Sequence, residues 1–380
     1  PPPPPPHTPP PPPPTHTSRC SSAASDVYKR QSLESARKNS VDYAGWLVTR
    51  LNRLVAPLLV LIVSWAGIGI IMGLFGVSPA LIQYASQASL IPTWFLAIYI
   101  MVVILAPVTY RLWRSMGLWS VFLFGLAAAL VDAAFFLADV RWLGWTNYFW
   151  VWLAVHQLGY AWRDERFRSS AGLLMLSAAG LATLAVLILK GPYPLAMVGS
   201  PDEGLSNTLP PKFTLLALGV FQYGLLLAIE RPMRQVLGKL EFWAATVLIN
   251  TMIMTVYLWH ITVMIVFVAL LVLAGGTGLG LEPGTSAWWY SRILWIAILI
   301  VLLVPVALAL SPLERRGRNE SAPVPSPARQ ISGAMMLCLG IALLAMYGYG
   351  GGPIQHLDIM SFGLVIVGAS ISGLLPALRR

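Results

Sequence analysis

The chain contains ten apolar segments of about 20 residues each, and these limit its fold more than any other feature of the sequence. A helix of about 20 apolar residues is long enough to cross the hydrocarbon core of a bilayer, which is about 30 Å thick. Of the residues, 57% are hydrophobic and 11% are charged, whereas soluble domains carry about 25% charged residues. We therefore predict an all-α fold, a polytopic integral membrane helical bundle of about ten transmembrane helices, with spans near 54–76, 94–110, 118–138, 145–161, 171–189, 213–229, 245–273, 289–310, 331–348 and 357–376.

Residues 1–31 are predicted to lie outside the folded protein. Residues 1–14 are proline apart from His7 and Thr8, and such a tract cannot pack a core. The run from Ser18 to Gln31 resembles the translated sequencing-adaptor peptide that is often fused to truncated reading frames. It has neither the apolar segment of a signal peptide nor the amphipathic arginine pattern of a transit peptide. We expect 1–31 to be a disordered artefact and the natural N-terminus to be missing.

The basic residues gather in every second connection between the apolar segments. By the positive-inside rule these connections are cytoplasmic. This predicts a multi-pass protein of the cell membrane with both ends in the cytoplasm, and it explains the net charge of +10 without a nucleic-acid partner. The basic connections hold Arg50, Arg53, Arg111, Arg114, Arg163, Arg166, Arg168, Arg231, Arg234, Lys239, Arg315, Arg316, Arg318, Arg329, Arg379 and Arg380, and the alternate ones hold Arg141, Lys190, Lys212 and Arg292.

The predicted spans fall into two groups. Residues 32–313 form a membrane domain, 314–330 a proline-rich cytoplasmic linker, and 331–380 two additional transmembrane helices.

The chain has two cysteines, which excludes a disulfide framework and a thiolate zinc site. We predict no metal.

The polar side chains that stand out inside the predicted spans are Asp132, His156 with its neighbour Gln157, Asn250, Tyr257 and His260. An ionisable group in a span is costly, so it normally faces the bundle interior or a wet cavity and indicates function. At 100° per residue, Asn250 and Tyr257 share one helix face and His260 lies about 80° away. The alternative for each is a hydrogen bond that only locks two helices together.

The connection 190–212 contains Tyr193 and Asn207, and it is too rich in Gly and Pro for a helix. It is also too apolar for a plain solvated loop, and irregular backbone at membrane depth is tolerated only where it is buried or lines a cavity. We expect it to fold toward the bundle as part of a pocket; the alternative is an ordinary surface loop.

Arg50 and Arg53 act either as topogenic charges or as a binding site for an anionic cofactor, because guanidinium groups pair with phosphate.

Several stretches of the sequence stand out by their order and spacing: Arg50-Leu-Asn-Arg53, Trp94–Tyr99 with Ala106-Pro107, Asn147–Tyr160, Tyr193–Gly199, Ser206-Asn207, Pro210-Pro211 and Thr255–His260. Together they resemble the membrane-bound acyltransferase family 3, particularly its actinobacterial-type members. The resemblance covers about 45–313, and the two spans after the linker fall outside it.

The resemblance implies transfer of an acyl group from cytoplasmic acyl-CoA to a hydroxyl of a cell-envelope glycan, a lipid or a small molecule. Arg50 and Arg53 would hold the CoA phosphates. The acceptor pocket is predicted from Tyr193, Asn207, Asn250 and Asp132, and the candidate catalytic residues are His260, Tyr257 and His156. The expected partners are acyl-CoA, the acceptor and membrane lipids.

The main catalytic signature of the family, a basic residue followed about ten positions later by His in the first helix, is absent from this sequence. We therefore expect a fragment without the first two helices of the family, which does not catalyse acyl transfer alone. His156 has a cytoplasmic position, and His260 has no carboxylate nearby in its span to orient its ring. A polytopic transporter or flippase and a non-catalytic membrane scaffold remain as alternative classes.

Overall fold

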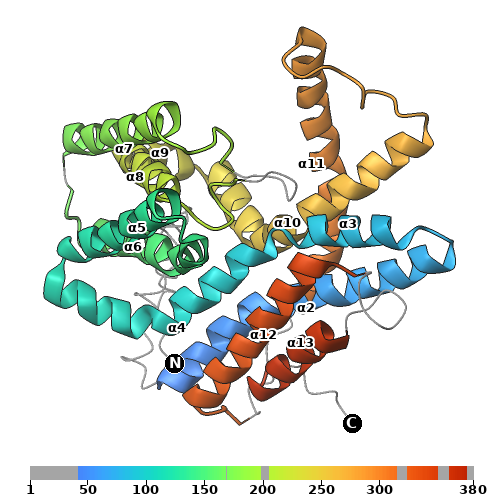
Figure 1. Ribbon diagram of the computed structural model, residues 1–380, viewed down its shortest axis with the longest axis horizontal. Helices are drawn as coiled ribbons and strands as arrows, with labels where there is room; N and C mark the ends of the chain where they lie inside the picture. Colours follow the sequence, from blue (N-terminus) through green and yellow to red (C-terminus); the bar gives the residue numbers. More distant parts are fainter. Residues whose placement is uncertain (1–41, 168, 198–204, 315–322, 350–358, 375–380) are drawn as a thin grey trace, which may run out of the picture.

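The computed structural model describes residues 42–167, 169–197, 205–314, 323–349 and 359–374, and these are helical throughout apart from short connections (Figure 1). The predicted tail 1–31 lies outside the described residues. In chain order the helices are α2 Tyr43–Leu74, α3 Pro79–Leu90, α4 Thr93–Met116, α5 Trp119–Leu137, the 3₁₀ helix η1 Arg141–Thr146, α6 Asn147–Arg163, α7 Ser170–Lys190, α8 Phe213–Ala228, α9 Glu230–Leu237, α10 Leu240–Leu273, α11 Ser286–Glu314, α12 Pro327–Tyr347 and α13 Ile359–Ile371.

The all-α membrane fold predicted from the apolar segments is confirmed. Each of the ten segments coincides with a helix, and in the described residues seven spans are long and apolar enough to cross a bilayer. An eighth is obtained when α8 and α9, which meet at a bend of 59°, are taken as one span. The other two segments correspond to shorter helices, α6 with 17 residues and α13 with 13.

Several boundaries differ from the prediction. Helix α2 begins at Tyr43, where the Asp42 carboxylate accepts from the Gly45 N–H at 2.8 Å as an N-cap, so Arg50 and Arg53 lie inside the helix and not before it. The prediction missed α3 and α9, because hydropathy detects only segments that must contact lipid. Helix α12 begins at Pro327, inside the predicted linker 314–330, with Ser326 accepting from the Arg329 N–H as its cap.

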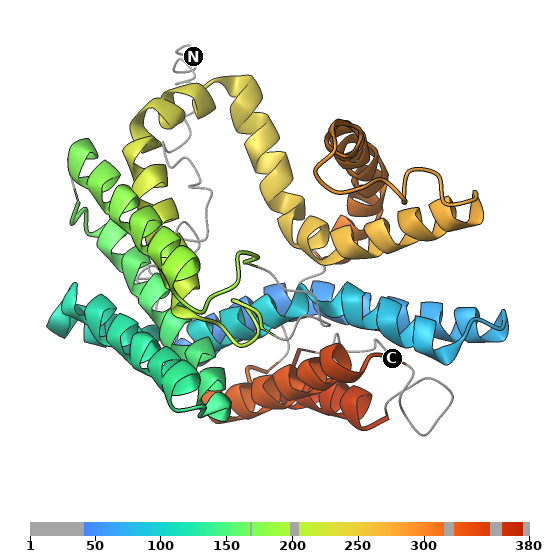
Figure 2. The ribbon, with the colours of Figure 1, turned by 45° about the horizontal axis from the view of Figure 1, so that its top comes forward.

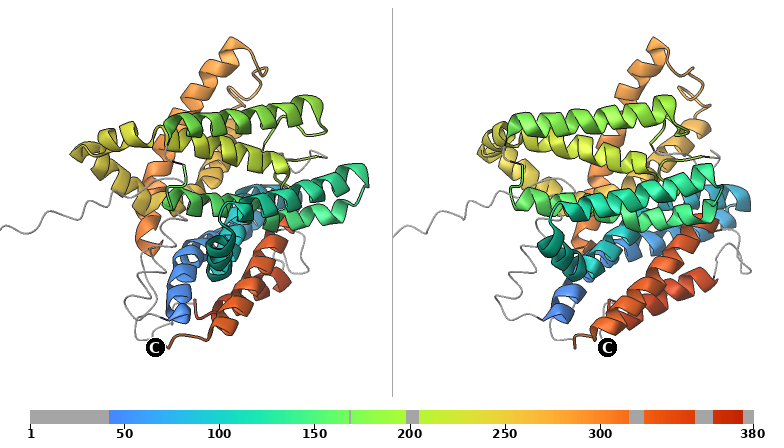
Figure 3. Two further views of the ribbon diagram at one scale, coloured as in Figure 1. Left: turned by 90° about the vertical axis from the view of Figure 1, so that its left-hand side faces the viewer. Right: turned by 60° about the vertical axis from the view of Figure 1, so that its left-hand side comes forward.

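Helices α5 to α8 form one side of the molecule. The pairs α7–α8 and α5–α6 each lie side by side in both views of Figure 3. Helices α7 and α8 approach closely because of glycine: a Cβ at Gly180 would lie 2.6 Å from the Phe221 nitrogen. A separate apolar core joins α5, α6 and α8 to α4 and is built around Phe124, Val151 and Leu216.

The largest apolar core lies among α2, α3, α4, α10, α12 and α13. Figure 2 shows α2 to α4 as a central layer, with α10 and α11 on one side and α12 and α13 on the other. Helices α12 and α13 pack backbone against backbone, since a Cβ at Gly368 would lie 2.6 Å from the Gly333 carbonyl oxygen. The two C-terminal helices are thus part of the main bundle.

Candidate functional site

Asp132, near the end of α5, is the centre of a buried hydrogen-bond network. Its side chain is 2% exposed. One carboxylate oxygen accepts from Asn147 Nδ2 of α6 at 2.8 Å, and the other accepts from Tyr193 Oη at 2.9 Å and from the Phe213 N–H at 2.7 Å. Tyr193 and Phe213 stand at the two ends of the loop 191–212. A single carboxylate therefore fastens both ends of this loop to α5 and α6.

Asn207 organises the interior of the same loop. Its Nδ2 donates to the carbonyl oxygens of Pro194 and Ala196 at 2.7 and 2.9 Å, and its Oδ1 accepts from Thr214 Oγ1 at 2.8 Å. Asn207 is fully buried. The described parts of the loop are folded onto the bundle, as their composition predicted. The loop thereby brings together Asp132, Tyr193 and Asn207, which are three of the four residues predicted to line the acceptor pocket.

The sequence reasoning missed Lys212, which is 0% exposed at the start of α8. Its Nζ lies 3.5 Å from the centroid of the Phe135 ring, and within the described part of the chain it has no hydrogen-bond acceptor. Burial lowers the pKa of Lys212 to about 8, against an opposing effect of the Asp132 charge. In the sequence Lys212 resembles an ordinary loop cation, and only its position directly after Pro210-Pro211 distinguished it.

A row of aromatic side chains connects this network to α10. Tyr148 Oη of α6 donates to the Thr208 carbonyl oxygen of the loop at 3.3 Å. From Tyr148 the ring contacts continue to Trp94 at 6.4 Å between centroids, then to Trp152 at 5.9 Å. They end with Phe95, whose centroid lies 5.8 Å from Trp152 and 5.7 Å from Tyr257, and these distances are typical of favourable aromatic pairs.

Tyr257 and His260 lie next to each other on α10. Tyr257 Oη donates to the Pro92 carbonyl oxygen at 2.9 Å, which ties α10 to the start of α4. His260 Nδ1 lies 2.7 Å from the Tyr257 carbonyl oxygen, and since a carbonyl can only accept, Nδ1 carries the proton in this contact. The other ring nitrogen, Nε2, then has a free lone pair on an exposed side chain. The carbonyl supplies the ring orientation for which no carboxylate was found in the sequence.

His156 is placed differently, inside the contact between α6 and α4. Its Nε2 lies 3.0 Å from Tyr160 Oη, and Tyr160 Oη in turn donates to the Ala106 carbonyl oxygen at 3.3 Å. His156 is buried. Gln157 beside it donates to the Thr109 carbonyl oxygen at 3.2 Å. The bonds of Tyr160 and Gln157 hold α6 against α4 around Pro107, and His156 supports Tyr160 from within α6.

The remaining predicted residues lie on helices α2 and α10. Arg50 is buried and Arg53 is exposed, both in the first three turns of α2. Asn250 is exposed on α10. It shares a face with Tyr257 by helix geometry, but it lies seven residues earlier, where α10 is less buried.

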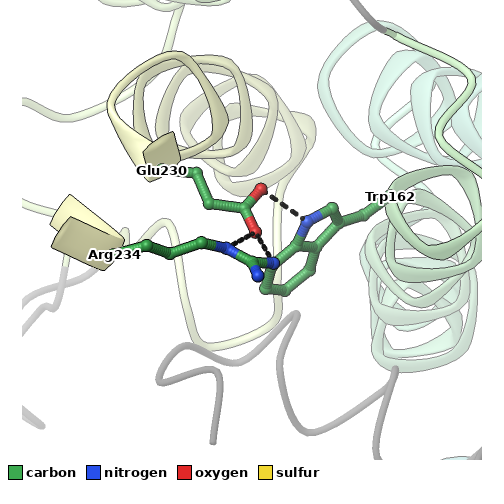
Figure 4. Close-up of polar contacts among 3 residues, drawn as sticks. All are labelled: Trp162, Glu230 and Arg234. Carbon is green, nitrogen blue, oxygen red and sulfur yellow. Dashed lines mark hydrogen bonds and ion pairs between the residues drawn. The ribbon is translucent and has the colours of Figure 1, made fainter. Parts of the chain in front are cut away.

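A second polar cluster, also missed, lies where α6 ends and α8 bends into α9 (Figure 4). The Glu230 carboxylate accepts from Trp162 Nε1 at 3.0 Å and from Arg234 Nε at 2.9 Å. Asp164, two residues after Trp162, accepts from Trp113 Nε1 of α4 at 2.8 Å. These contacts fix the ends of α4, α6 and α8, at the opposite end of α6 from Asn147.

Comparison with known proteins identifies the family. Neither the search of curated proteins nor the search of solved structures found a match. The family model for the acyltransferase domain of family 3 matches residues 32–312, a range that includes Arg50, the Asp132 network and His260. The chain therefore belongs to the membrane acyltransferases of family 3.

Proposed function

We propose that this protein is an integral membrane O-acyltransferase of the cell membrane, which transfers an acyl group from cytoplasmic acyl-CoA to a hydroxyl of a glycan, lipid or small molecule. The observation that carries the proposal is the family match over 32–312, because it spans every polar cluster described above. The family match supports a membrane acyltransferase in general, and the proposal adds the acyl-CoA donor and the hydroxyl acceptor.

Arg50 and Arg53 are the proposed donor site. Guanidinium groups bind phosphate through paired, charge-assisted hydrogen bonds, and CoA carries phosphates at its nucleotide end. Arg50 is buried against the bundle and Arg53 is exposed one turn later. A buried arginine is held in place before a ligand arrives, and an exposed one is accessible from the cytoplasmic side on which we place it.

His260 is the proposed general base. With Nδ1 donating to the Tyr257 carbonyl oxygen, Nε2 can accept the proton of an acceptor hydroxyl. The hydroxyl oxygen then bonds to the thioester carbonyl carbon, the C–S bond breaks, and the proton passes from Nε2 to the CoA sulfur. General base catalysis contributes about 10²–10⁴-fold to a rate. The Asp132 network and the aromatic row shape the acceptor side of this arrangement.

The donor and acceptor parts are separated along the membrane normal. Trp65 Nε1 of α2 donates to Thr262 Oγ1 of α10 at 3.0 Å, and Thr262 follows His260 by two residues. Trp65 lies 15 residues after Arg50, which is about 22 Å along a helix. The nucleotide of acyl-CoA and the base would thus be far apart, and the pantetheine arm of the donor would extend between them.

The test has two stages on the purified chain in nanodiscs. Binding of a non-hydrolysable acyl-CoA analogue is measured first for the wild type, Arg53→Ala and the control Arg141→Ala, an exposed arginine on the other side of the bundle. Loss of a charge-assisted pair corresponds to about tenfold or more in affinity, so Arg53→Ala should bind correspondingly more weakly. Equal binding by all three proteins would reduce Arg53 to a topogenic charge.

Release of free CoA thiol in the presence of membrane glycan and lipid extracts is measured second. If this chain carries its own general base, His260→Gln slows turnover by about 10²–10⁴-fold with analogue binding unchanged. Analogue binding without any thiol release by the wild type would favour the expectation that the chain alone lacks its base. Absence of analogue binding by the wild type would refute the proposed function.

A further inference from the structure

Helices α12 and α13 lie outside the matched range 32–312, so the family assigns them no role. In the structure α12 runs parallel to α2, as the alternation of spans requires for two helices that enter from the same side (Figure 1). Gln330 Nε2 donates to the Ala44 carbonyl oxygen at 3.0 Å, and Tyr349 Oη donates to the Ile62 carbonyl oxygen at 3.3 Å. The two contacts are 18 residues apart in α2 and 19 apart in the C-terminal segment, so α12 accompanies α2 over about 27 Å.

Gln330 is the contact at the Arg50 end of this pair. It is fully buried, and its Nε2 also donates to the Pro325 carbonyl oxygen at 2.7 Å. Its own backbone carbonyl accepts from Ser372 Oγ, at the end of α13, at 3.4 Å. One side chain and its backbone thus join the start of α2, the entry to α12 and the end of α13.

The first turn of α2 is held from the other side as well. Tyr43 Oη donates to the Ile104 carbonyl oxygen of α4 at 3.0 Å. Together the two bonds fix the first two residues of the helix between α4 and α12. The first N–H groups of a helix have no helical partner; Asp42 pairs one of them as the N-cap, and the bonds of Tyr43 and Ala44 add tertiary contacts that oppose fraying.

Arg50 and Arg53 depend on this start. Arg50 follows Ala44 by six residues, and Arg53 follows by nine. These are only about 9 and 13 Å along the helix axis. Since a helix moves as a rod over such lengths, a shift or rotation of the first turn moves both guanidinium groups. Arg50 is also buried, so its position is set by the packing around α2.

We propose that the α12–α13 pair is part of the donor site, and that Gln330 is a positioning residue which holds the start of α2 so that Arg50 and Arg53 can bind the acyl-CoA phosphates. The inference rests on the proposed function, in which these arginines bind the donor. It assigns to the C-terminal helices a role in acyl-CoA affinity and not only in stability.

The experiment compares Gln330→Met with Gln83→Met in the full chain. Gln83 makes the same kind of bond to the other end of α12, donating from Nε2 to the Tyr347 carbonyl oxygen at 2.9 Å. Methionine keeps the length of the side chain and removes only its hydrogen bonding. Affinity for a non-hydrolysable acyl-CoA analogue, the unfolding midpoint, and hydrogen exchange of residues 43–54 are measured for both variants.

We expect Gln330→Met to weaken analogue binding about three- to tenfold, the equivalent of one lost hydrogen bond, and to accelerate exchange in 43–54. Gln83→Met should lower the unfolding midpoint but leave analogue binding unchanged. If Gln330→Met does not accumulate in membranes, Ser372→Ala removes the 3.4 Å contact of α13 to the Gln330 carbonyl oxygen, together with the 2.7 Å bond of Ser372 to the Gly368 carbonyl oxygen, and should weaken binding about twofold.

The outcomes separate the two proposals. Failure of the wild type to bind the analogue would refute the proposed function and this inference with it. Normal binding by the wild type with equal affinity in both glutamine variants would overturn the inference alone. Equal weakening by both variants would also overturn it, because the effect would then follow general stability.

Discussion

Replacing Asp132 by alanine tests whether the outer loop is held by hydrogen bonds to one carboxylate. The change removes the acceptor of three donors: Asn147 Nδ2, Tyr193 Oη and the Phe213 N–H. A buried donor left without a partner costs about 1–3 kcal/mol. Three such donors predict a loss of about 3–9 kcal/mol in the free energy of unfolding, and we expect the lower part of this range because water can enter the space left by the carboxylate.

Asp132→Asn separates the hydrogen bonds from the charge. The Asn147 amide can rotate by 180°, at the loss of its 3.4 Å bond to the Ala128 carbonyl oxygen. Its oxygen then accepts from the newly introduced amide nitrogen, while the newly introduced amide oxygen keeps the Tyr193 and Phe213 donors. All three bonds survive as neutral ones, and the expected loss falls to about 1–3 kcal/mol. The Lys212 ammonium would then be buried without its carboxylate. Adding Lys212→Met should recover stability in Asp132→Asn, giving a positive coupling energy in the double-mutant cycle.

Unfolding is followed by circular dichroism in mixed micelles with increasing denaturant. The control is Asp139→Asn, which removes an exposed carboxylate just beyond α5 that pairs with exposed Arg141. Asparagine suits this position because its backbone φ is 52°. We expect no measurable change in the control. An Asp132→Ala protein within about 1 kcal/mol of the wild type would refute the view that this network holds the loop.

The fold followed from the sequence wherever lipid dictates it. A span needs about 20 apolar residues, and its backbone must be helical because the bilayer offers no other hydrogen-bond partners. Helix ends outside the hydrocarbon are chosen by caps and by neighbouring helices. Hence the start of α2 at Tyr43 and the short α9 were not predicted, although Asp42 and Glu230 contribute to their definition.

The site was only partly predictable for a related reason. Asp132 stood out because polar residues at membrane depth need partners. Tyr193 and Asn207 stood out because they lie in a connection too apolar for a plain solvated loop. Lys212 did not stand out, since its burial is created by Phe135 from a distant part of the chain. The orientation of the His260 ring was not predictable, because it comes from the Tyr257 backbone carbonyl and not from a carboxylate. Backbone partners cannot be recognised from side-chain patterns.

Three further predictions concern topology, packing and titration. In a cysteine-free background, an impermeant maleimide should label Glu282→Cys in intact cells but Arg234→Cys only after lysis, and labelling in the reverse order would invert the orientation; buried Asn207 is unsuitable for this assay. Gly180→Ala should destabilise the protein by about 1–3 kcal/mol because its Cβ would clash with the α8 backbone, whereas Gly67→Ala, with open space around it, should not; similar unfolding midpoints for the two variants would contradict the close packing of α7 on α8. Finally, burial lowers the pKa of Lys212 to about 8 from its ordinary value of 10.5, so between these two pH values the unfolded chain binds more protons at this site than the folded one. Stability at this site must therefore rise with pH across that window and be independent of pH below it. Subtracting the unfolding free energies of Lys212→Met from those of the wild type removes the titration of all other groups, so the difference should move in favour of the wild type from pH 8 to 10.5. Parallel curves for the two proteins would mean that Lys212 binds its proton equally well in the folded and unfolded states. That result would contradict the burial of the Lys212 ammonium against Phe135.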